Sequence, residues 1–361
     1  MQTASDITTP SRRLVSLDIY RGMTMLAMMA HTLGLKELSH LPVVGFVYRQ
    51  LEHADWVGFH FEDFILPSFL FIMGVSLALS NGKRRERGES FPGRLKHAAK
   101  RSLSLFLFGF VLSWISAGKM VTGPGVLQLL ALSYFLGFIF SDMSVGKRFA
   151  VFAGLLFTYW FFVFVTPVYD VGRNSYILYK NLVYLIDETL TNTPSRWGYI
   201  YTVITSGAIV VYGSIIGDLY RNRNSDAQFM KVLAVCGAAG VAAGLALHPV
   251  MPVIKRMFTS SYTLLTCGLA SVTFLALFRL VDVASVRRWG FPFVVVGMNS
   301  IFIYLLHNLL HPWFMDTLGV FIDPLQGAVG AWITPIRHVT ALVLEWFVCL
   351  WLYRRKIFFR L

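Results

Sequence analysis

Residues 149–167 read F-A-V-F-A-G-L-L-F-T-Y-W-F-F-V-F-V-T-P, an apolar run without a charged side chain. At a rise of about 1.5 Å per residue, a helix of this length crosses a hydrocarbon core about 30 Å thick. Similar runs recur along all 361 residues of the chain, of which 56% are hydrophobic and only 14% are charged. A soluble protein carries about 25% charged residues. The sequence therefore predicts an all-α bundle that crosses a membrane many times.

We expect a polytopic integral membrane protein with about ten transmembrane helices. No stretch is polar enough to form a soluble domain, so residues 1–361 are expected to form one transmembrane domain with a short cytoplasmic tail at residues 1–13. The expected spans are residues 17–35, 61–80, 102–118, 124–141, 149–167, 198–218, 229–247, 261–281, 291–311 and 335–353.

The formal net charge of the chain is +13. In a soluble protein this excess would indicate a nucleic-acid partner, but here the basic residues lie in short loops between apolar runs, so we expect no nucleic acid. Cytoplasmic loops of membrane proteins are enriched in Lys and Arg. If both termini are cytoplasmic, most of the 32 Lys and Arg residues lie on the cytoplasmic side of the membrane, and they include a dense group at residues 83–101. The charge distribution therefore predicts two cytoplasmic termini and a lipid bilayer around the chain.

On this topology His97 is the only cytoplasmic histidine among nine. The others lie at or near the outer face. A neutral imidazole can act as a base, an acid or a metal ligand near pH 7. The distribution favours proton chemistry or metal binding at the outer end of the bundle, and a structural role at the membrane interface is the alternative for any single histidine.

Residues 52–63 read E-H-A-D-W-V-G-F-H-F-E-D and directly precede an apolar helix that Pro67 starts or bends. A carboxylate close to a histidine can orient the ring and raise its basicity. We expect Asp63 to lie within reach of His53, and the alternative interpretation is a solvated outer loop.

Two further pairs share a helix face. Asp18 and Arg21 are spaced by three in the first span, where charged groups are expensive and usually functional; the alternative is a salt bridge at the inner interface. His307 and His311 are spaced by four, which suits a pair of metal ligands. The sequence offers no obvious third ligand, so we expect no metal.

Four stretches of the chain resemble one known family. They read S-L-D-I-Y-R-G at 16–22; H-A-D-W-x-G at 53–58, followed by D-x-x-x-P at 63–67 and F-I-M-G at 71–74; P-G-V-L-Q at 124–128; and M-N-S-I-F-I-Y at 298–304. Together they resemble the catalytic domain of the lysosomal heparan-α-glucosaminide N-acetyltransferase and its bacterial relatives, a family of multi-pass membrane acyltransferases. The motifs occur in the family's order over nearly the whole chain.

The resemblance implies a multi-pass acyltransferase of a bacterial inner (cytoplasmic) membrane. Cytosolic acetyl-CoA would donate an acetyl group to an amine or hydroxyl of a sugar or glycan acceptor at the periplasmic face. His53 matches the family's catalytic histidine, and Asp63 and His31 complete the expected catalytic set. His31 lies where the family has an asparagine near the outer end of the first helix. The motif residues expected to bind donor or acceptor are Asp18, Arg21, Trp56, Gln128, Asn299, Tyr304 and His307.

Coenzyme A is a polyanion, so its phosphates need a basic mouth on the cytoplasmic side. Arg287 and Arg288, together with the loop at 83–101, are the candidates. The sequence leaves open whether His53 acts as a general base or as a transient acyl carrier. It also leaves open a homodimer. The rival function is a proton-coupled transporter or flippase in which the outer histidines and the Asp18–Arg21 pair relay protons.

The predicted topology is testable by cysteine labelling. On a background lacking Cys236, Cys267 and Cys349, a cysteine at position 55 should react with a membrane-impermeant maleimide added to intact cells. A cysteine at position 90 should react only after the cells are opened, because that loop is expected on the cytoplasmic side. The reverse pattern would overturn the topology and the outer position of His53.

Overall fold

The computed structural model of the protein describes residues 14–30, 33–120, 125–191 and 199–359. The predicted tail at residues 1–13 lies outside them. Within the described residues the chain is helical, and β-pairing is limited to two isolated bridges. The helices are α1 Val15–Ala30, α2 Pro42–Leu51, α3 Phe61–Glu86, α4 Phe91–Ala117, α5 Val126–Ile139, α6 Val145–Val165, α7 Leu182–Thr191, α8 Tyr199–Arg221, α9 Asp226–Leu247, α10 Ser260–Leu277, α11 Phe291–Met298, α12 Ser300–Ile322, α13 Gln326–Val329 and α14 Ile333–Arg354. A π-helical turn, Phe278–Val283, extends α10.

The all-helical membrane class is confirmed. Among the described residues, 7 helical segments are long and apolar enough to cross a membrane, and one of them joins α12 to α14. The helix α5 is apolar but shorter. Every expected span overlaps a helix, whereas the count of about ten crossings and the cytoplasmic termini stay predictions.

One expected span is wrong as a single helix. The span at 291–311 is divided at Asn299, whose φ of −124° and ψ of 34° are not helical. The Asn299 amide donates to the carbonyl of Ile357 at 3.1 Å and accepts from the backbone of Phe359 at 3.0 Å. Asparagine side chains often hydrogen-bond backbone groups in place of helix continuation. Here the two bonds tie the break between α11 and α12 to the C-terminal segment.

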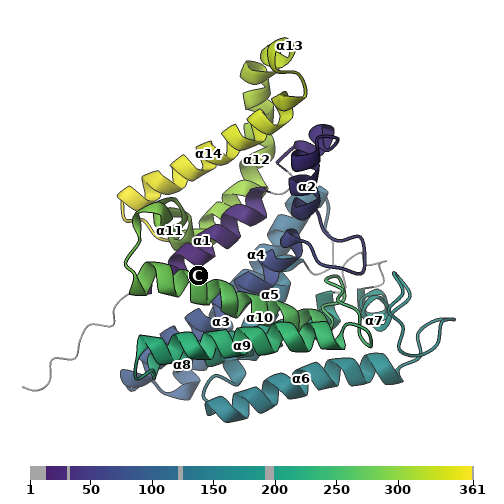
Figure 1. Cartoon of the computed structure of the whole chain (residues 1–361), viewed down its shortest axis with the longest axis vertical. Helices are drawn as coiled ribbons and strands as arrows, with labels where there is room; N and C mark the ends of the chain where they lie inside the picture. The colour runs from purple at the N-terminus through teal and green to yellow at the C-terminus, as the bar shows by residue number, and fades with distance from the viewer. Residues whose placement is uncertain (1–13, 31–32, 121–124, 192–198, 360–361) are drawn as a thin grey trace, which may run out of the picture.

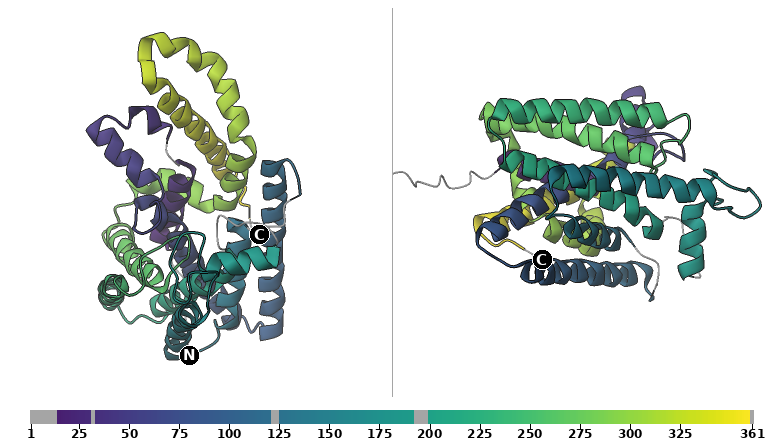
Figure 2. Two further views of the ribbon diagram at one scale, coloured as in Figure 1. Left: turned by 90° about the vertical axis from the view of Figure 1, so that its right-hand side faces the viewer. Right: turned by 90° about the horizontal axis from the view of Figure 1, so that it is seen from below.

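The helices form two groups (Figure 1). The helices α6, α8, α9 and α10 run alongside one another across the lower half, and α12 and α14 form a hairpin that rises away from them, with α13 at its tip. The views in Figure 2 show the same hairpin standing clear of the lower helices. α1 and α11 lie against each other between the two groups.

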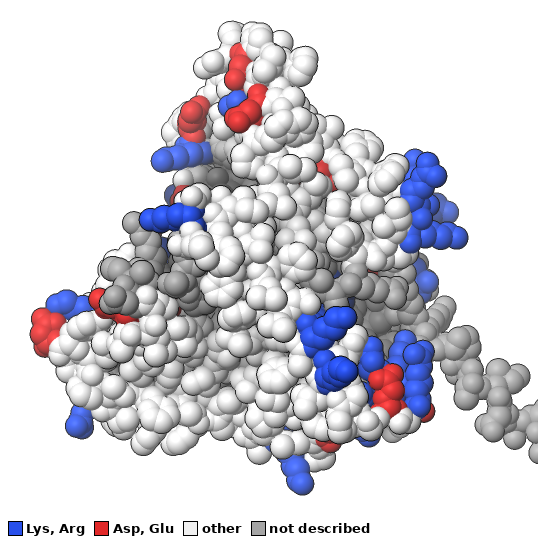
Figure 3. Space-filling model, turned by 180° about the vertical axis from the view of Figure 1, so that it is seen from behind, with Lys and Arg blue, Asp and Glu red and all other residues white. Residues whose placement is uncertain are grey.

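Burial separates central helices from lipid-facing ones. The apolar windows of α3 and α8 are 72% and 83% buried, whereas that of α9 is 17% buried. The large apolar side chains left on the surface, such as Leu107, Phe161 and Val235, suit contact with lipid chains. One face of the molecule carries a broad zone almost free of charged side chains, with Lys and Arg mostly toward its margins (Figure 3). This pattern fits a bilayer around the bundle.

The central pair α3 and α8 approach closely through glycines. A Cβ on Gly74 would lie 2.2 Å from the carbonyl oxygen of Val210, and one on Gly213 would lie 2.3 Å from that of Phe71. Small residues let membrane helices pack backbone against backbone. This contact fixes α3, and therefore the residues at its outer end, against the centre of the bundle.

We expect Gly213→Ala to lower the melting temperature of the purified protein. The added methyl group has no space, and overpacking typically destabilises by about 1–3 kcal/mol. Gly154→Ala on α6 is the matched control, because a Cβ there meets nothing within 4 Å. Alanine is also the better helix former by about 1 kcal/mol, so the control should be neutral or stabilised. Equal melting temperatures of the two variants would contradict the close approach of α3 and α8.

Candidate active site

His53 lies in the loop between α2 and α3, where Asp63 holds its ring. Nδ1 of His53 lies 3.1 Å from Oδ1 of Asp63. The Asp63 side chain has no solvent exposure, whereas that of His53 is 28% exposed. A buried carboxylate behind a partly exposed imidazole fixes the orientation of the ring. The structure places Asp63 within reach of His53, as the sequence analysis expected, and their catalytic roles stay predictions.

The position of Asp63 follows from how α3 begins. His60 is the N-cap, and Oδ2 of Asp63 accepts hydrogen bonds from the backbone N–H groups of His60 at 2.9 Å and Ala54 at 3.1 Å. Pro67 has no N–H to donate to the carbonyl of Asp63, one turn earlier. The buried hydroxyl of Tyr262 donates to that carbonyl at 2.6 Å. The side-chain carboxylate and the backbone carbonyl of Asp63 are therefore both fixed by hydrogen bonds.

Lys255, in the loop before α10, is the third member of the site. Its Nζ lies 2.8 Å from Nδ1 of His53 and 3.6 Å from Oδ1 of Asp63. Burial lowers the pKa of Lys255 from its ordinary value, against the opposing effect of the Asp63 and Glu62 carboxylates. Nδ1 of His53 thus faces both a carboxylate and an amine. If Nδ1 donates to Asp63, the basic lone pair is on Nε2, which lies 3.4 Å from Nζ of Lys255. If Nδ1 instead accepts from Lys255, Nε2 carries the ring proton and is not basic.

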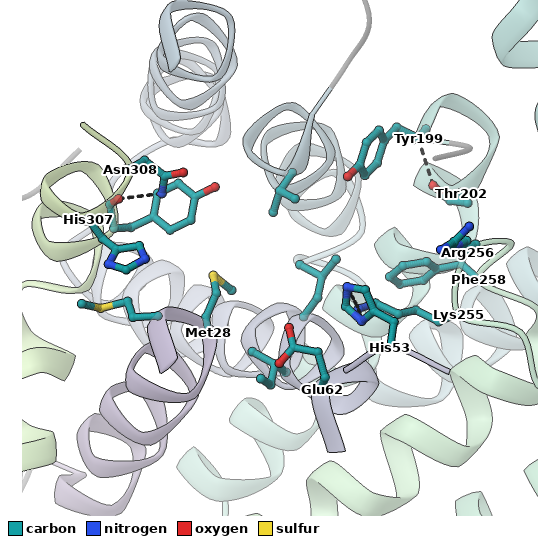
Figure 4. Close-up of a pocket in the computed structure, with 15 residues that line it drawn as sticks. Met28, His53, Glu62, Tyr199, Thr202, Lys255, Arg256, Phe258, His307 and Asn308 are labelled. Atoms are coloured by element: carbon teal, nitrogen blue, oxygen red, sulfur yellow. Dashed lines mark hydrogen bonds between the residues drawn. The ribbon is translucent and has the colours of Figure 1, made fainter. Parts of the chain in front are cut away.

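His53 and Lys255, which both approach Asp63, line a cavity of about 430 Å³. Glu62 also lines it, and its buried Oε2 has no hydrogen-bond partner among the described residues. In Figure 4, His53 and Lys255 lie on one side of the cavity and His307 on the other. Leaving a buried acceptor unsatisfied costs about 1–3 kcal/mol. Glu62 is therefore placed to accept a hydrogen bond from a molecule in the cavity.

A second cavity, of about 540 Å³, adjoins the first. Met28, Val126 and Tyr304 line both of them. Its charged lining residues are Asp18, Arg21 and Arg101. The two cavities therefore meet at the three side chains that they share, with His53 at one cavity and Arg21 and Arg101 at the other.

The expected pair Asp18 and Arg21 is an ion pair at 3.5 Å that borders the second cavity. Arg21 also donates to the hydroxyl of Ser76 at 2.7 Å. Tyr304 lies between the cavities, and His307 lines the first. Together with His53, five of the predicted site residues thus border the two cavities.

Other predicted residues hold the scaffold. The Trp56 indole donates to the carbonyl of Tyr176 at 2.7 Å, which ties the His53 loop to the following outer segment. Gln128 is fully buried, and its amide oxygen accepts from the backbone of Gly125 at 3.0 Å. Asn299 binds the C-terminal segment, as described above. None of the three lines either cavity.

The arginines expected to bind coenzyme A lie elsewhere. Arg287 donates to the carbonyl of Val281 at 3.2 Å, and neither Arg287 nor Arg288 lines the cavities. Arg101, from the basic segment 83–101, does line the second cavity and lies over the Tyr134 ring at 4.8 Å. His31 lies outside the described residues.

Sequence reasoning missed Lys255, which is 202 residues from His53 along the chain. One signal was available. Lys255 and Arg256 form a basic pair in a loop expected on the outer side, where Lys and Arg are usually depleted. Two basic residues that depart from this depletion, on the side where most histidines are expected, indicate a functional position.

The fold and the site define a helical membrane protein with a histidine–carboxylate pair at an internal cavity. The sequence model of the family described as "Heparan-alpha-glucosaminide N-acetyltransferase, catalytic" matches residues 13–248. The chain belongs to this family, and the resemblance seen in its motifs is confirmed. The match includes His53 and Asp63, whereas Lys255, Tyr304 and His307 lie beyond it.

Two curated relatives carry the name heparan-alpha-glucosaminide N-acetyltransferase. The Homo sapiens protein is 25% identical over 97% of this chain and 60% of its own length. The Mus musculus protein is 25% identical over 84% of this chain and 54% of its own length. The chain thus spans little more than half the length of these relatives. It is a membrane protein of an acetyltransferase family.

The lowered pKa of Lys255 is testable by competitive labelling with acetic anhydride at a series of pH values. Because burial lowers that pKa, Lys255 loses its proton at a lower pH. Its reactivity should therefore reach half of its maximum below about 10.4, the ordinary lysine value. Mass spectrometry reads the labelled peptide, and Lys255→Arg identifies its signal. A midpoint at or above the ordinary value would contradict this description of the site.

Proposed function

We propose that the protein is an acetyl-CoA-dependent acyltransferase that modifies an amine or hydroxyl of a sugar or glycan at the periplasmic face of a bacterial inner membrane. The proposal rests on the observation that the two cavities adjoin each other and share lining residues. One is bordered by His53 and Lys255, and the other by Arg21 and Arg101. Family membership supports acetyl transfer as the reaction class.

The second cavity suits the donor. Coenzyme A carries phosphates that basic side chains bind and a long flexible arm that ends in the thioester. Arg21 and Arg101 supply positive charge, while Leu105, Leu127 and Ile301 supply apolar walls for the arm. Passing Met28 and Tyr304, the arm would bring the thioester into the first cavity. The donor would then stay on the cytoplasmic side of the bundle while its acetyl group reaches His53.

The first cavity suits the acceptor and the chemistry. A neutral His53, oriented by Asp63, can take a proton from the incoming amine or hydroxyl as it attacks the thioester carbonyl. The carbon–sulfur bond then breaks, and the imidazolium can return the proton to the coenzyme A thiolate that leaves. The alternative is attack by the imidazole itself, which would give a transient acyl-histidine and release the coenzyme A thiol before the acceptor reacts. Glu62 can accept a hydrogen bond from a hydroxyl or amine of the acceptor.

A proton-coupled transporter remains the rival function. It would use the same charged groups, but it would need neither a thioester-sized cavity nor binding of coenzyme A. Thermal stabilisation by coenzyme A and acetyl-CoA, and not by ATP, would separate the two functions, because a ligand stabilises only a protein that binds it.

The deciding experiment follows transfer of radiolabelled acetyl from acetyl-CoA to a panel of amino sugars. We expect His53→Ala to lower turnover by about 10²–10⁴-fold, the range for a lost general base, while stabilisation by coenzyme A is retained. His40→Ala is the matched control, since that histidine is exposed and, among the described residues, its hydrogen bond goes to the nearby carbonyl of Glu37. Label that stays on wild-type protein but not on His53→Ala would indicate the acyl-histidine route.

Retention of more than about a third of the turnover by His53→Ala would exclude a general-base role for this histidine. Absence of acetyl transfer from the wild-type protein to every acceptor, together with absence of stabilisation by coenzyme A, would overturn the proposed function itself.

A further inference from the structure

A second cluster of ionisable side chains joins the two arms of the hairpin. His307 and His311 lie one turn apart on α12, and Glu345 comes from α14. Nδ1 of His307 lies 2.9 Å from Oε2 of Glu345, and Nδ1 of His311 lies 3.0 Å from Oε1. The two imidazole rings are tilted against each other with centroids 4.2 Å apart. Three groups that commonly bind metals thus converge, including the third group that the sequence did not reveal.

The burial of Glu345 requires a compensating positive charge. Its side chain has no solvent exposure, and Cys349, one turn further along α14, belongs to a buried apolar cluster. Among the described residues its ion-pair partners are the two histidines, without a Lys or Arg. Buried carboxylates are normally paired with a full charge or bound to a metal. Two neutral imidazoles donate hydrogen bonds but leave the negative charge uncompensated.

The geometry matches the requirements of a zinc-class ion. Each residue offers one ligand atom, and these atoms all lie within 4.8 Å of one another. Ligand bonds of about 2.0–2.2 Å in a tetrahedral site place neighbouring ligand atoms about 3.3 Å apart. The two imidazole–carboxylate pairs, at 2.9 and 3.0 Å, are close to this separation. Two imidazoles and one carboxylate are the ligand set of zinc sites that keep a fourth position open.

We propose that His307, His311 and Glu345 bind one divalent zinc-class ion. His307 lines the first cavity, so the open fourth position can take a water or an oxygen of a molecule bound there. The ion would compensate the charge of Glu345 and fasten α12 to α14. It would also place positive charge across the cavity from His53 (Figure 4). This inference concerns metal binding alone and does not depend on acyl transfer.

The test measures zinc directly. Purified full-length protein is stripped with a chelator, reloaded with Zn²⁺ and freed of excess metal, and zinc is counted by mass spectrometry. We expect about one zinc per chain and a higher melting temperature after reloading, because binding to the folded state stabilises it. His311→Ala and Glu345→Gln should each lower the affinity by more than about tenfold, since even residues that only support metal ligands contribute that much.

His40→Ala should bind zinc like the wild type, because that exposed histidine lies outside the cluster. Glu345→Gln keeps a carbonyl oxygen for the two histidines and removes only the charge, so it is the variant expected to fold best. Substoichiometric zinc on wild-type protein, below about a tenth per chain at saturating Zn²⁺, would overturn the proposal. So would unchanged zinc affinity in both folded variants. The wild-type measurement decides even if a variant fails to fold.

Discussion

The carboxylate of Asp63 is the group on which the N-terminal end of α3 and the His53 loop depend. It has no solvent exposure, caps α3 and binds the ring of His53. Lys255 approaches the same carboxylate from a distant loop. A buried charge is tolerated only when every part of it is satisfied, so the loop, the helix start and the lysine must be in place together. The contacts of Asp63 that orient His53 are therefore the same contacts that stabilise the fold of this region.

The helices around the cavities pack in two ways, some through glycines and others through long side chains. α3 and α8 pack backbone against backbone through glycines, which leaves no space between them. α1, α5 and α12 meet through long side chains such as Met28 and Tyr304, which border the space between the two cavities. Close packing of one helix pair thus provides the rigid wall against which the other helices leave a passage. Methionine is flexible enough to adjust such a passage to a ligand.

The sequence predicted what depends on local pattern. Apolar runs located the helices, and the short separation of His53 and Asp63, at the start of one helix, predicted their contact. It could not predict contacts that depend on tertiary packing. Lys255 comes from another loop, and Glu345 lies inside an apolar span more than 30 residues beyond its histidines, where nothing local marks it. For Asn299 the ligand role that the resemblance implies stays a prediction, and the bonds of its amide to the C-terminal backbone are a further contact that only tertiary packing shows.

The bonds of Asn299 have a practical consequence for handling the protein. They hold Ile357 and Phe359, and the side chains of Phe358 and Phe359 form part of the wall of the second cavity. The C-terminal segment is thus a structural wall and not a free tail. A purification tag or fluorescent protein joined directly after Phe359 would strain that wall, so fusion partners belong at exposed loop positions such as Tyr169 and Asp170.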